Sequence, residues 1–498
     1  MEKRLLIANR GEIAIRIIRT AKKLGFICIV FQSDKDANAY YLNFADEIIA
    51  ANDANSEISI FLNIPKIIEL AQQYHIGYIH PGYGFLSENP DFAQACLEHN
   101  IVFIGPSPEL IRNMGLKTVA KEFAQKAGLP LIQGSEGVVN TIEKAQTIAE
   151  TIGYPILLKA SAGGGGRGMR VVDKPEALER NFNSAQKEAL TAFGNGDLFI
   201  EKYISQPKHI EFQILGDKFG NVIHLGEREC SLQRKHQKMI EEAPSCALTP
   251  EKRQQMGQLA VQFAKTIGYY SAGTIEFLLD GNGDYYFMEM NTRIQVEHPV
   301  TEMITGIDLI EWQLRIAMDE PLTIKQDDIS LNGWAIECRI NAEDAQNRFA
   351  PESGFIESVY FPTSDKIRIE TGIEQGSVVN TNFDSMLAKI IVHDTNRQLA
   401  IEKMLRTLNY TQIIGIKTTI PFYKKVLHHP DFTQGNYTTK WIEENYKPEM
   451  LYDDEEEIIG ALTASIVYAL DYLKLASNTP SYTNDDLSIW VLNKRINK

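Results

Sequence analysis

The chain has 498 residues, 44% of them hydrophobic and 23% charged, and its formal net charge is −15 at pH 7. This composition is typical of a globular protein of about two to four domains. The negative charge argues against a nucleic-acid partner held by overall charge. The sequence has neither a run of apolar residues long enough to span a membrane nor a signal-peptide pattern at its start, so we expect a cytoplasmic protein without membrane contact.

The five cysteines are scattered, odd in number and without a CxxC pair; they are Cys28, Cys96, Cys230, Cys246 and Cys338. This pattern argues against a disulfide framework and against a zinc site. It fits a protein that works in a reducing compartment.

The N-terminal segment, residues 1–112, has the pattern of an α/β domain. A short apolar strand at 4–8 is followed by a helix within 9–25 and by a second strand at 26–33, which predicts a right-handed parallel βαβ unit. Only Gly11 follows the first strand, so the GxGxxG fingerprint of a dinucleotide-binding fold is missing. We therefore do not expect a dinucleotide site here.

A run of four glycines, Gly163 to Gly166, lies within the stretch LLKASAGGGGRGMRVV. The residues on both sides are strand-like, so the run is expected at the tip of a strand–loop–strand hairpin. Backbone N–H groups without neighbouring Cβ atoms can approach phosphate oxygens closely, and Lys159 adds a positive charge just before the loop. The alternative is a flexible surface hairpin, but the ordering entropy of four glycines favours a phosphate contact.

A second hairpin, residues 273–293, contains Asn-Gly, the strongest short hairpin signal. If Asn282 and Gly283 form a two-residue type I′ turn, Glu276 and Glu289 face each other across the strands. Facing like charges are destabilising unless a cation lies between them. Asn291 adds an oxygen on the same face, so the pattern favours Mg²⁺ or Mn²⁺ over the alternative of a solvated polar face.

Two charged stretches accompany this hairpin. Residues 224–245 are rich in basic side chains and form either a solvated surface or a pocket wall. Residues 291–302, directly after the hairpin, bring an arginine, a glutamine, a glutamate and a histidine together; these are Arg293, Gln295, Glu297 and His298. An anion site beside a metal–phosphate site, with Glu297 as a candidate base, indicates phosphoryl transfer to a small oxyanion.

Eight motifs closely resemble those of biotin carboxylase, and the similarity runs from residue 3 to about 445. They are IANRGEIAIRIIR, HPGYGFLSEN, KASAGGGGRGMRVV, KHIEFQILGD, ERECSLQRKHQK, EMNTRIQVEHPVTEM, ECRINAED and FDSMLAKI. The resemblance implies an α/β and α+β chain with an ATP-grasp fold. Its expected parts are a Rossmann-like N-terminal domain (1–112), an ATP-grasp domain (113–330) whose glycine-rich lid covers about 131–203, and a biotin carboxylase C-terminal domain (331–446).

The resemblance also implies a two-step reaction. ATP phosphorylates bicarbonate to carboxyphosphate, and the carbon dioxide released from it is attacked by the ureido nitrogen of biotin on a carrier protein. The implied cofactors are ATP, two Mg²⁺ or Mn²⁺ ions and biotin held by a separate protein. Position and charge, rather than covalent chemistry, are what the protein supplies in such a reaction.

Site residues follow from the resemblance, position by position. The expected ATP ligands are Lys117, Lys159, the loop residues Gly163, Gly164, Gly165 and Gly166, the hinge residues Glu201, Lys202 and Ile204, and His209, Gln233 and His236. The expected metal ligands are Glu276, Glu289 and Asn291. The expected bicarbonate cradle is Lys238, Arg293, Gln295 and the backbone of Val296, with Glu297 as the base. On the biotin side are Arg339, which would stabilise the enolate, and Tyr83 and Gly84.

The sequence departs from the family pattern at three places in or near the site. Lys235 stands where the family often has arginine, which replaces a bidentate fork by a point charge. The segments RFAPESGFI (348–356) and VVNTNFDSM (378–386) also differ from the commoner family sequences. The biotin side is therefore less well defined by the resemblance than the ATP side.

The C-terminal tail, residues 447–498, is acidic at 453–457 and then contains an apolar helix candidate. No MKM biotinylation motif occurs, so the chain resembles a stand-alone subunit that forms a homodimer and works with a separate biotin carrier and a carboxyltransferase subunit. The helix would dock onto a partner or onto its own domain. The substrate finally carboxylated, such as acetyl-CoA, pyruvate or another acyl-CoA, is chosen by the transferase.

Two alternative functions share part of this sequence pattern. The first is an ATP-grasp ligase with another acceptor, such as a carbamoyl-phosphate or carboxylate–amine ligase; the motifs RIQVEHP and ECRINAED argue against it. The second is a regulatory protein that binds ATP without catalysis. It predicts the loss of Lys238, Glu289 or Glu297, and all three are present.

Overall fold

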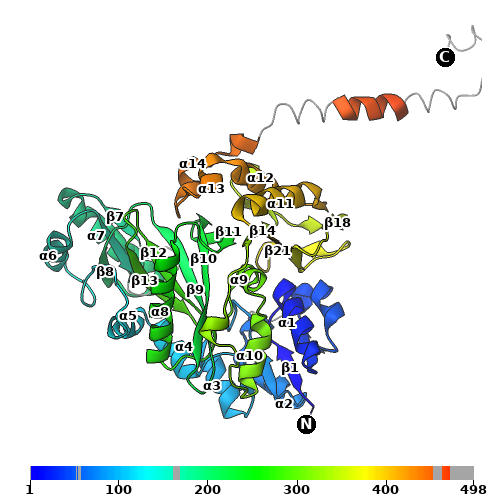
Figure 1. Cartoon of the computed structure of the whole chain (residues 1–498), viewed down its shortest axis with the longest axis horizontal. Coiled ribbons are helices and arrows are strands. Elements are labelled where there is room, and N and C mark those ends of the chain that lie inside the picture. Colours follow the sequence, from blue (N-terminus) through cyan, green and yellow to red (C-terminus); the bar gives the residue numbers. More distant parts are fainter. Residues whose placement is uncertain (1, 52, 54–57, 161–168, 452–461, 472–498) are drawn as a thin grey trace, which may run out of the picture. The chain divides into compact units, whose positions relative to one another are not determined.

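The first strand, helix and strand of the chain form the parallel βαβ unit that the sequence predicts. The structure is a computed structural model that describes residues 2–51, 53, 58–160, 169–451 and 462–471. The chain divides into two units, residues 1–446 and residues 447–498. Figure 1 shows the element labels used below.

The N-terminal sheet has five parallel strands in the order β3-β2-β1-β4-β5. These strands are β1 (Arg4–Ile7), β2 (Ile27–Gln32), β3 (Glu47–Ala50), β4 (Tyr78–His80) and β5 (Val102–Phe103), and the helices of this part are α1 (Gly11–Lys23), α2 (Ile64–Gln73), α3 (Pro90–Glu98) and α4 (Pro108–Gly115). Helix α1 buries Ile13, Ile17 and Ile18 because they recur on one face of the helix. It ends before Gly25, whose φ of +77° breaks the helical backbone.

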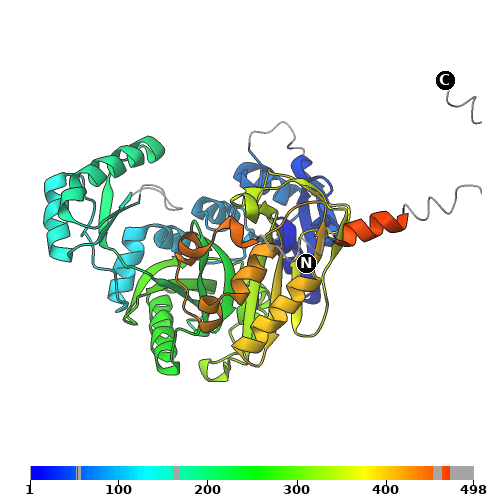
Figure 2. The same cartoon turned by 90° about the horizontal axis from the view of Figure 1, so that it is seen from above.

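The glycine-rich stretch lies between two strands of a small antiparallel sheet. The sheet order is β7-β6-β8, formed by β6 (Ile156–Ala160), β7 (Arg170–Val172) and β8 (Leu198–Lys202). Helices α6 (Ile142–Ile152) and α7 (Leu178–Phe193) pack on it, and Figure 2 shows these elements standing out from the other sheets of residues 1–446. The predicted strand–loop–strand arrangement is confirmed, while Gly163 to Gly166 lie outside the described residues.

Eight later strands form one antiparallel sheet, in the order β13-β12-β9-β10-β11-β14-β21-β19. Its strands are β9 (Lys208–Gly216), β10 (Val222–Arg234), β11 (Gln237–Ala243), β12 (Ser271–Leu279), β13 (Tyr285–Asn291), β14 (Trp334–Asn341), β19 (Ile367–Thr371) and β21 (Met386–Asp394). The sheet continues across residue 330, so strands from 113–330 and from 331–446 hydrogen-bond to each other through the β11–β14 pair.

Helices cover this large sheet and link it to the N-terminal domain. They are α5 (Lys117–Lys126), α8 (Pro250–Thr266), α9 (His298–Thr305), α10 (Leu309–Ala317), α11 (Arg397–Tyr410), α12 (Ile420–His428), α13 (Pro430–Gln434) and α14 (Trp441–Asn445). One buried cluster joins Ile17 of α1 with Leu215 of β9 and Leu314 of α10. A second joins the sheet to α5 and α8 around Phe212 and Phe277. Apolar contact therefore fixes the N-terminal domain against the large sheet.

Three short two-stranded sheets complete the C-terminal part of residues 1–446. They pair β15 (Glu343–Asp344) with β16 (Ala350–Pro351), β17 (Gly354–Phe355) with β20 (Val378–Val379), and β18 (Ser358–Tyr360) with β22 (Gln412–Ile414). In the second unit, residues 462–471 form a helix whose apolar side chains are exposed, Tyr468 by 74%. Its docking remains a prediction. The described helices include none that is both long and apolar enough to cross a membrane.

The turn between β12 and β13 differs from the prediction. Gly283 has a φ of +85°, and its N–H donates to the carbonyl of Asp280 at 3.1 Å. This is a three-residue loop of type I with a glycine bulge, and the predicted type I′ turn is wrong. The Asp280 carboxylate accepts from the N–H groups of Asn282 and Asp284, both at 2.9 Å, which stabilises the longer loop.

The pairing of the two carboxylates is nevertheless confirmed, because a β-bulge next to Glu276 shifts the register back by one residue. Beyond this bulge Glu276 lies directly opposite Glu289, and Thr274 lies opposite Asn291. The extra loop residue and the β-bulge thus compensate each other, and the hairpin brings the expected oxygen ligands together.

We predict that Phe277→Ala lowers the free energy of unfolding by about 3–5 kcal/mol, because it leaves a cavity in the core of the large sheet. Phe277 is fully buried and packs edge-on against Phe212, with ring centroids 6.0 Å apart. Urea unfolding measures the change. The matched control is Phe219→Ala, since Phe219 is 62% exposed and its loss should change stability by less than about 0.5 kcal/mol. Equal effects of the two variants would contradict the assigned core.

Candidate active site

A cavity of about 1600 Å³ opens between the N-terminal domain, the small sheet and the large sheet. It is larger than the ~300–1,000 Å³ of a typical small-molecule site, so it has room for more than one ligand. The predicted site residues on its wall are Tyr83, Gly84, Lys117, Lys159, Glu201, Lys202, Ile204, His209, Gln233, His236, Lys238, Glu276, Glu289, Asn291, Arg293, Gln295, Val296 and Arg339. Residues spread over three predicted domains thus surround one space.

Lys238, on β11, is the centre of the charge arrangement. Its Nζ lies 2.6 Å from Glu211 Oε2, 3.0 Å from Glu276 Oε1 and 2.7 Å from Glu297 Oε1. Alternation along the strands explains this meeting, because Glu211 and Glu276 are directly paired across β9 and β12 and project from the same face. One ammonium group therefore neutralises part of the charge of three buried carboxylates.

Glu297 does not line the cavity wall. Its side chain is fully buried behind Lys238 and Arg339, and Arg339 Nη2 lies 2.9 Å from Glu297 Oε2. Burial alone would raise the pKa of Glu297, but the charges of Lys238 and Arg339 outweigh it and hold the pKa well below its usual range. Glu297 is therefore ionised, which is the form that a general base needs.

The facing pair Glu276 and Glu289 is electrostatically unequal. Burial raises the pKa of Glu276, but Lys238 and His209 outweigh it and lower that pKa strongly. The pKa of Glu289 is raised, by burial first and then by the charge of Glu276. Asn291 Nδ2 donates to Glu276 Oε1 at 2.9 Å and keeps the amide beside the pair. Two carboxylates and one amide oxygen, with the charge of Glu289 only partly compensated by Lys117 and His209, fit a hard divalent cation.

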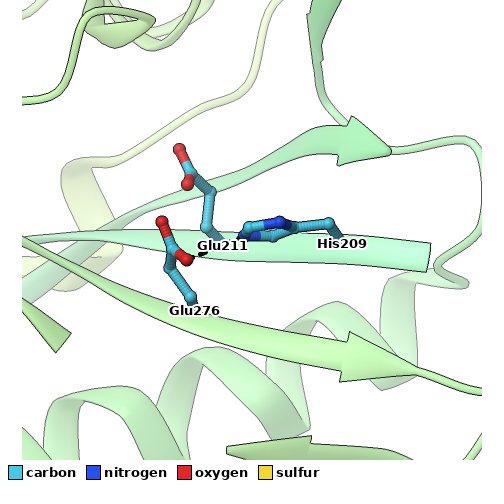
Figure 3. A group of neighbouring side chains, drawn as sticks. All are labelled: His209, Glu211 and Glu276. Carbon is cyan, nitrogen blue, oxygen red and sulfur yellow. Dashed lines mark ion pairs between the residues drawn. The ribbon is translucent and has the colours of Figure 1, made fainter. Parts of the chain in front are cut away.

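Figure 3 shows a second set of donors in the same region, His209, Glu211 and Glu276, whose side chains point toward one another. His209 Nε2 lies 3.0 Å from Glu276 Oε2. Glu211 has both oxygens in use, because Oε1 accepts from Arg228 and Oε2 from Lys238. Glu211 is thus already neutralised, and the donor set with Glu289 is the better site for a metal.

Elsewhere on the cavity wall, Glu201 on β8 holds two lysines. Lys121 and Lys159 each form an ion pair with one oxygen of the Glu201 carboxylate. Burial alone would raise the pKa of Glu201, but Lys159 and Lys121 outweigh it and hold the pKa at about 2. Lys202 points elsewhere, since its Nζ donates to the carbonyls of Gly153 and Tyr154 at 3.0 and 3.1 Å. Two lysines share one ionised carboxylate, so this part of the cavity wall keeps a net positive charge that suits an anionic ligand.

His236 lies at the tip of the β10–β11 hairpin, in a two-residue turn. Lys235 and His236 have φ values of +50° and +67°, a conformation that favours glycine or asparagine. The charged stretch is thus partly an exposed hairpin tip and partly, through Gln233 and Lys238, a pocket wall. Two non-glycine residues held in this strained turn indicate a constraint other than hairpin stability.

The loop after β13 is held by side chains. Arg293 Nε lies 2.8 Å from Glu88 Oε2, and its Nη1 donates to Gln295 Oε1 at 3.0 Å. Thr292 N–H donates to Glu88 Oε1 at 3.1 Å. Glu88 follows the Tyr83 segment, so the expected bicarbonate cradle and the expected biotin-side loop are in direct contact.

Some charged residues of the site were missed by sequence reasoning, namely Glu12, Lys121, Glu211, Arg228, Glu241 and Lys389. Arg228 is fully buried and bonds Gln213, Thr274 and Thr301 as well as Glu211. A signal existed for Glu211, which is two residues from His209 on a strand, and for Lys121, which is four residues from Lys117 on a helix.

Comparison with known families and proteins gives matches over most of the chain. Three family models match: the biotin carboxylase N-terminal domain at residues 1–111, the carbamoyl-phosphate synthase L chain ATP-binding domain at 117–325 and the biotin carboxylase C-terminal domain at 337–444. The 2-oxoglutarate carboxylase small subunit of Hydrogenobacter thermophilus is 49% identical over 94% of this chain and 99% of its own length. A biotin carboxylase of Nostoc sp. is 51% identical over 89% of this chain and 99% of its own length.

A solved structure agrees with these matches. The biotin carboxylase domain dimer of the Hydrogenobacter thermophilus 2-oxoglutarate carboxylase, in complex with MgADP, ADP and bicarbonate, superposes with a TM-score of 0.85 at 49% identity. The match covers 91% of this chain and 99% of that one. The fold expected from the motifs is thereby confirmed.

We predict that Glu201→Gln lowers stability in a pH-dependent way. The folded pKa of about 2 lies below the unfolded value of 4.5, so the ionised carboxylate stabilises the fold above pH 4.5 and this stabilisation is lost as the pH falls toward 2. The difference from the wild type should be roughly 1–3 kcal/mol at pH 7, reduced by the solvation of the two lysines, and should shrink below pH 4.5. Urea unfolding across this range measures it.

The control for this prediction is Glu143→Gln on the exposed surface of α6, which should change stability by less than about 0.5 kcal/mol. A Glu201→Gln difference that is the same at every pH would contradict the ion-pair assignment.

Proposed function

Because this chain belongs to the biotin carboxylase family, we propose that it uses ATP and bicarbonate to carboxylate biotin carried by a separate protein. The observation that carries the proposal is the contact of Lys238 with Glu297, which joins an anion-binding cation to a candidate base beside a divalent-cation site. This arrangement suits phosphoryl transfer to bicarbonate, a small anion that a base must deprotonate before it accepts the phosphoryl group.

In the first step, a bicarbonate oxygen attacks the γ-phosphorus of ATP, ADP leaves and carboxyphosphate forms. Lys238, Arg293, Gln295 and the Val296 N–H are proposed to hold the anion. Lys117, Lys121 and Lys159 are proposed to hold the ATP phosphates, because two of them already share Glu201 as an anionic anchor. The glycine loop, Gly163 to Gly166, would add backbone donors to the same phosphates.

The metal site of this proposal consists of Glu276, Glu289 and Asn291. A bound Mg²⁺ or Mn²⁺ would neutralise phosphate charge and orient the γ-phosphate. On the protein side, Lys238 and His209 keep Glu276 ionised and ready to act as a ligand. His236 and Gln233 are proposed to contact the nucleotide, together with the backbone of the 201–204 hinge.

Glu297 is the proposed base that takes the bicarbonate proton. In the resting site its pKa is too low for an effective base, because Lys238 and Arg339 both pair with it. A bicarbonate anion bound to Lys238 shares that positive charge and so raises the pKa of Glu297. Basicity therefore increases only when the substrate is present, which limits wasteful turnover.

In the second step, the C–O bond of carboxyphosphate breaks to give carbon dioxide and phosphate. The ureido nitrogen of biotin then attacks the carbon dioxide, and its N–H proton passes to the released phosphate. Arg339 is proposed to stabilise the negative charge that develops on the ureido oxygen. Tyr83 and Gly84 are proposed to line the biotin side. The partners in this proposal are a biotin carrier, a carboxyltransferase subunit and a second copy of this chain.

We predict that the purified chain releases ADP from ATP, magnesium and bicarbonate, and that free biotin stimulates this release. Glu297→Gln should lower the stimulated rate by about 10²–10⁴-fold, the usual contribution of a general base, while ATP still binds. Glu311→Gln, a partly exposed change on α10, is the control and should keep full activity. ATP hydrolysis that requires bicarbonate but is not stimulated by biotin would contradict biotin as the acceptor.

We predict that Glu289→Gln weakens magnesium-dependent nucleotide binding by about tenfold or more, because a charged ligand of the metal becomes neutral. Titration with ADP in the presence of magnesium, compared with titration in the presence of a chelator, isolates the metal-dependent part. In the absence of metal, the Glu289→Gln variant should be no less stable than the wild type, since it removes one of two facing buried negative charges. Unchanged magnesium dependence would exclude Glu289 as a ligand.

A further inference from the structure

Lys389, on β21, is a fully buried lysine with no role in the chemistry derived above. Its Nζ donates to the backbone carbonyl of Val296 at 2.8 Å and lies 3.2 Å from Glu12 Oε1. The same Nζ lies 5.9 Å from the ring centroid of Tyr83. A single side chain therefore contacts, or lies beside, three segments that are far apart in the sequence.

The burial of this lysine needs an explanation. A buried ammonium group carries a large desolvation cost, and well-packed apolar residues of similar volume often serve the fold equally well. The surroundings of Lys389 are charged as well as buried, since Glu370 and Arg339 are its direct neighbours across β19 and β14. Packing alone does not account for a positive charge at this position.

The carbonyl that Lys389 holds belongs to an irregular segment. Residues 292–297 connect β13 to α9 without being part of either element. Their backbone is held by side chains, by Glu88 at Thr292 and by Lys389 at Val296. The Val296 carbonyl is part of the peptide that joins Val296 to Glu297. A rotation of this peptide therefore moves the proposed base directly, and it moves the Val296 N–H, the proposed donor to bicarbonate, through the Val296 Cα.

The other partner of Lys389 belongs to the N-terminal domain. Glu12, on α1, is 3% exposed, and its Oε1 also accepts a hydrogen bond from the hydroxyl of Tyr83. Burial raises the pKa of Glu12 to about 7, against the charge of Lys389. Tyr83 is on the wall of the cavity in the segment expected to meet biotin. The contacts thus run without a gap from Tyr83 through Glu12 and Lys389 to the Val296 carbonyl.

We propose that Lys389 is a positioning residue for the carboxylation reaction, which holds the backbone next to Glu297 in register with Tyr83 on the biotin side. The inference rests on the proposed function, which assigns Tyr83 to the biotin side and the Val296 segment to the bicarbonate site. A ligand that moves Tyr83 then changes the position of the bicarbonate loop through Glu12 and Lys389. Binding of biotin is thereby coupled to the geometry of the bicarbonate site.

The test compares steady-state ADP release by the full chain and by Lys389→Met, which keeps the length of the side chain and removes its charge. We expect the KM for bicarbonate to rise about tenfold and the biotin-stimulated kcat to fall, while the KM for ATP stays within twofold. A purely structural role would lower the amount of active protein without separating the two KM values.

The matched control is Lys403→Met. Lys403 also donates to a backbone carbonyl, that of His393 at 2.9 Å, and pairs with a carboxylate, Asp394, at 2.5 Å. It lies on α11 and is not part of the cavity wall. This variant should leave both KM values unchanged. Equal effects of Lys389→Met and Lys403→Met would overturn the inference.

A double-mutant cycle tests the coupling itself. Tyr83→Phe removes the hydroxyl that bonds Glu12, and the combined Tyr83→Phe, Lys389→Met variant should lose less activity than the product of the two single losses. Fully multiplicative losses would overturn the coupling. If Lys389→Met does not fold, Glu12→Gln replaces it, since the amide keeps an acceptor for Tyr83 and removes the charge that pairs with Lys389.

The wild-type measurement in the same series separates the two proposals. Wild-type release that depends on bicarbonate and biotin, together with an unchanged bicarbonate KM in Lys389→Met, would overturn the positioning role and leave the proposed function standing. A wild type without this dependence would overturn the proposed function and the positioning role with it.

Discussion

The arrangement of the site depends on one buried ammonium group, that of Lys238, which contacts Glu211, Glu276 and Glu297. Burial alone would raise the pKa values of Glu276 and Glu297, and the charge of Lys238 is the largest effect that lowers both. With it, Glu276 is kept as a candidate metal ligand and Glu297 as a candidate base. Arg228 and Arg339 complete the neutralisation from behind. Lys238 pairs with Glu297 in the resting site, and a bound bicarbonate anion would contact the same ammonium group.

The fold supplies this arrangement by placing polar side chains on neighbouring strands of one sheet. Glu211, Glu276 and Lys238 come from β9, β12 and β11, and Arg339 comes from β14, on the far side of residue 330. The N-terminal domain adds Tyr83 and Glu12, which reach the sheet through Lys389. No single segment of the chain contains the site, and apolar contacts between α1, α10 and the sheet hold its parts together.

Much of the fold follows from local pattern, while the site follows from it only in part. The βαβ opening and the glycine hairpin have clear periodicity, and the structure has both. The opposition of Glu276 and Glu289 was predicted correctly from a wrong turn, because a bulge that leaves no sequence signal offset the extra loop residue. Arg228 and Lys389 were missed, since their partners lie on distant segments and only tertiary packing brings them together. The burial of Glu297 behind Lys238 also depends on tertiary packing between distant segments.

The measurement that tests the account most directly follows the oxygen of bicarbonate. If bicarbonate attacks the γ-phosphorus and the C–O bond then breaks, one bicarbonate oxygen ends in the phosphate product. Turnover of ¹⁸O-labelled bicarbonate with ATP, magnesium and biotin should therefore give phosphate that carries one labelled oxygen, detected by mass spectrometry. Phosphate without the label, formed at the same rate as ADP, would mean that water is the acceptor and would contradict the proposed reaction.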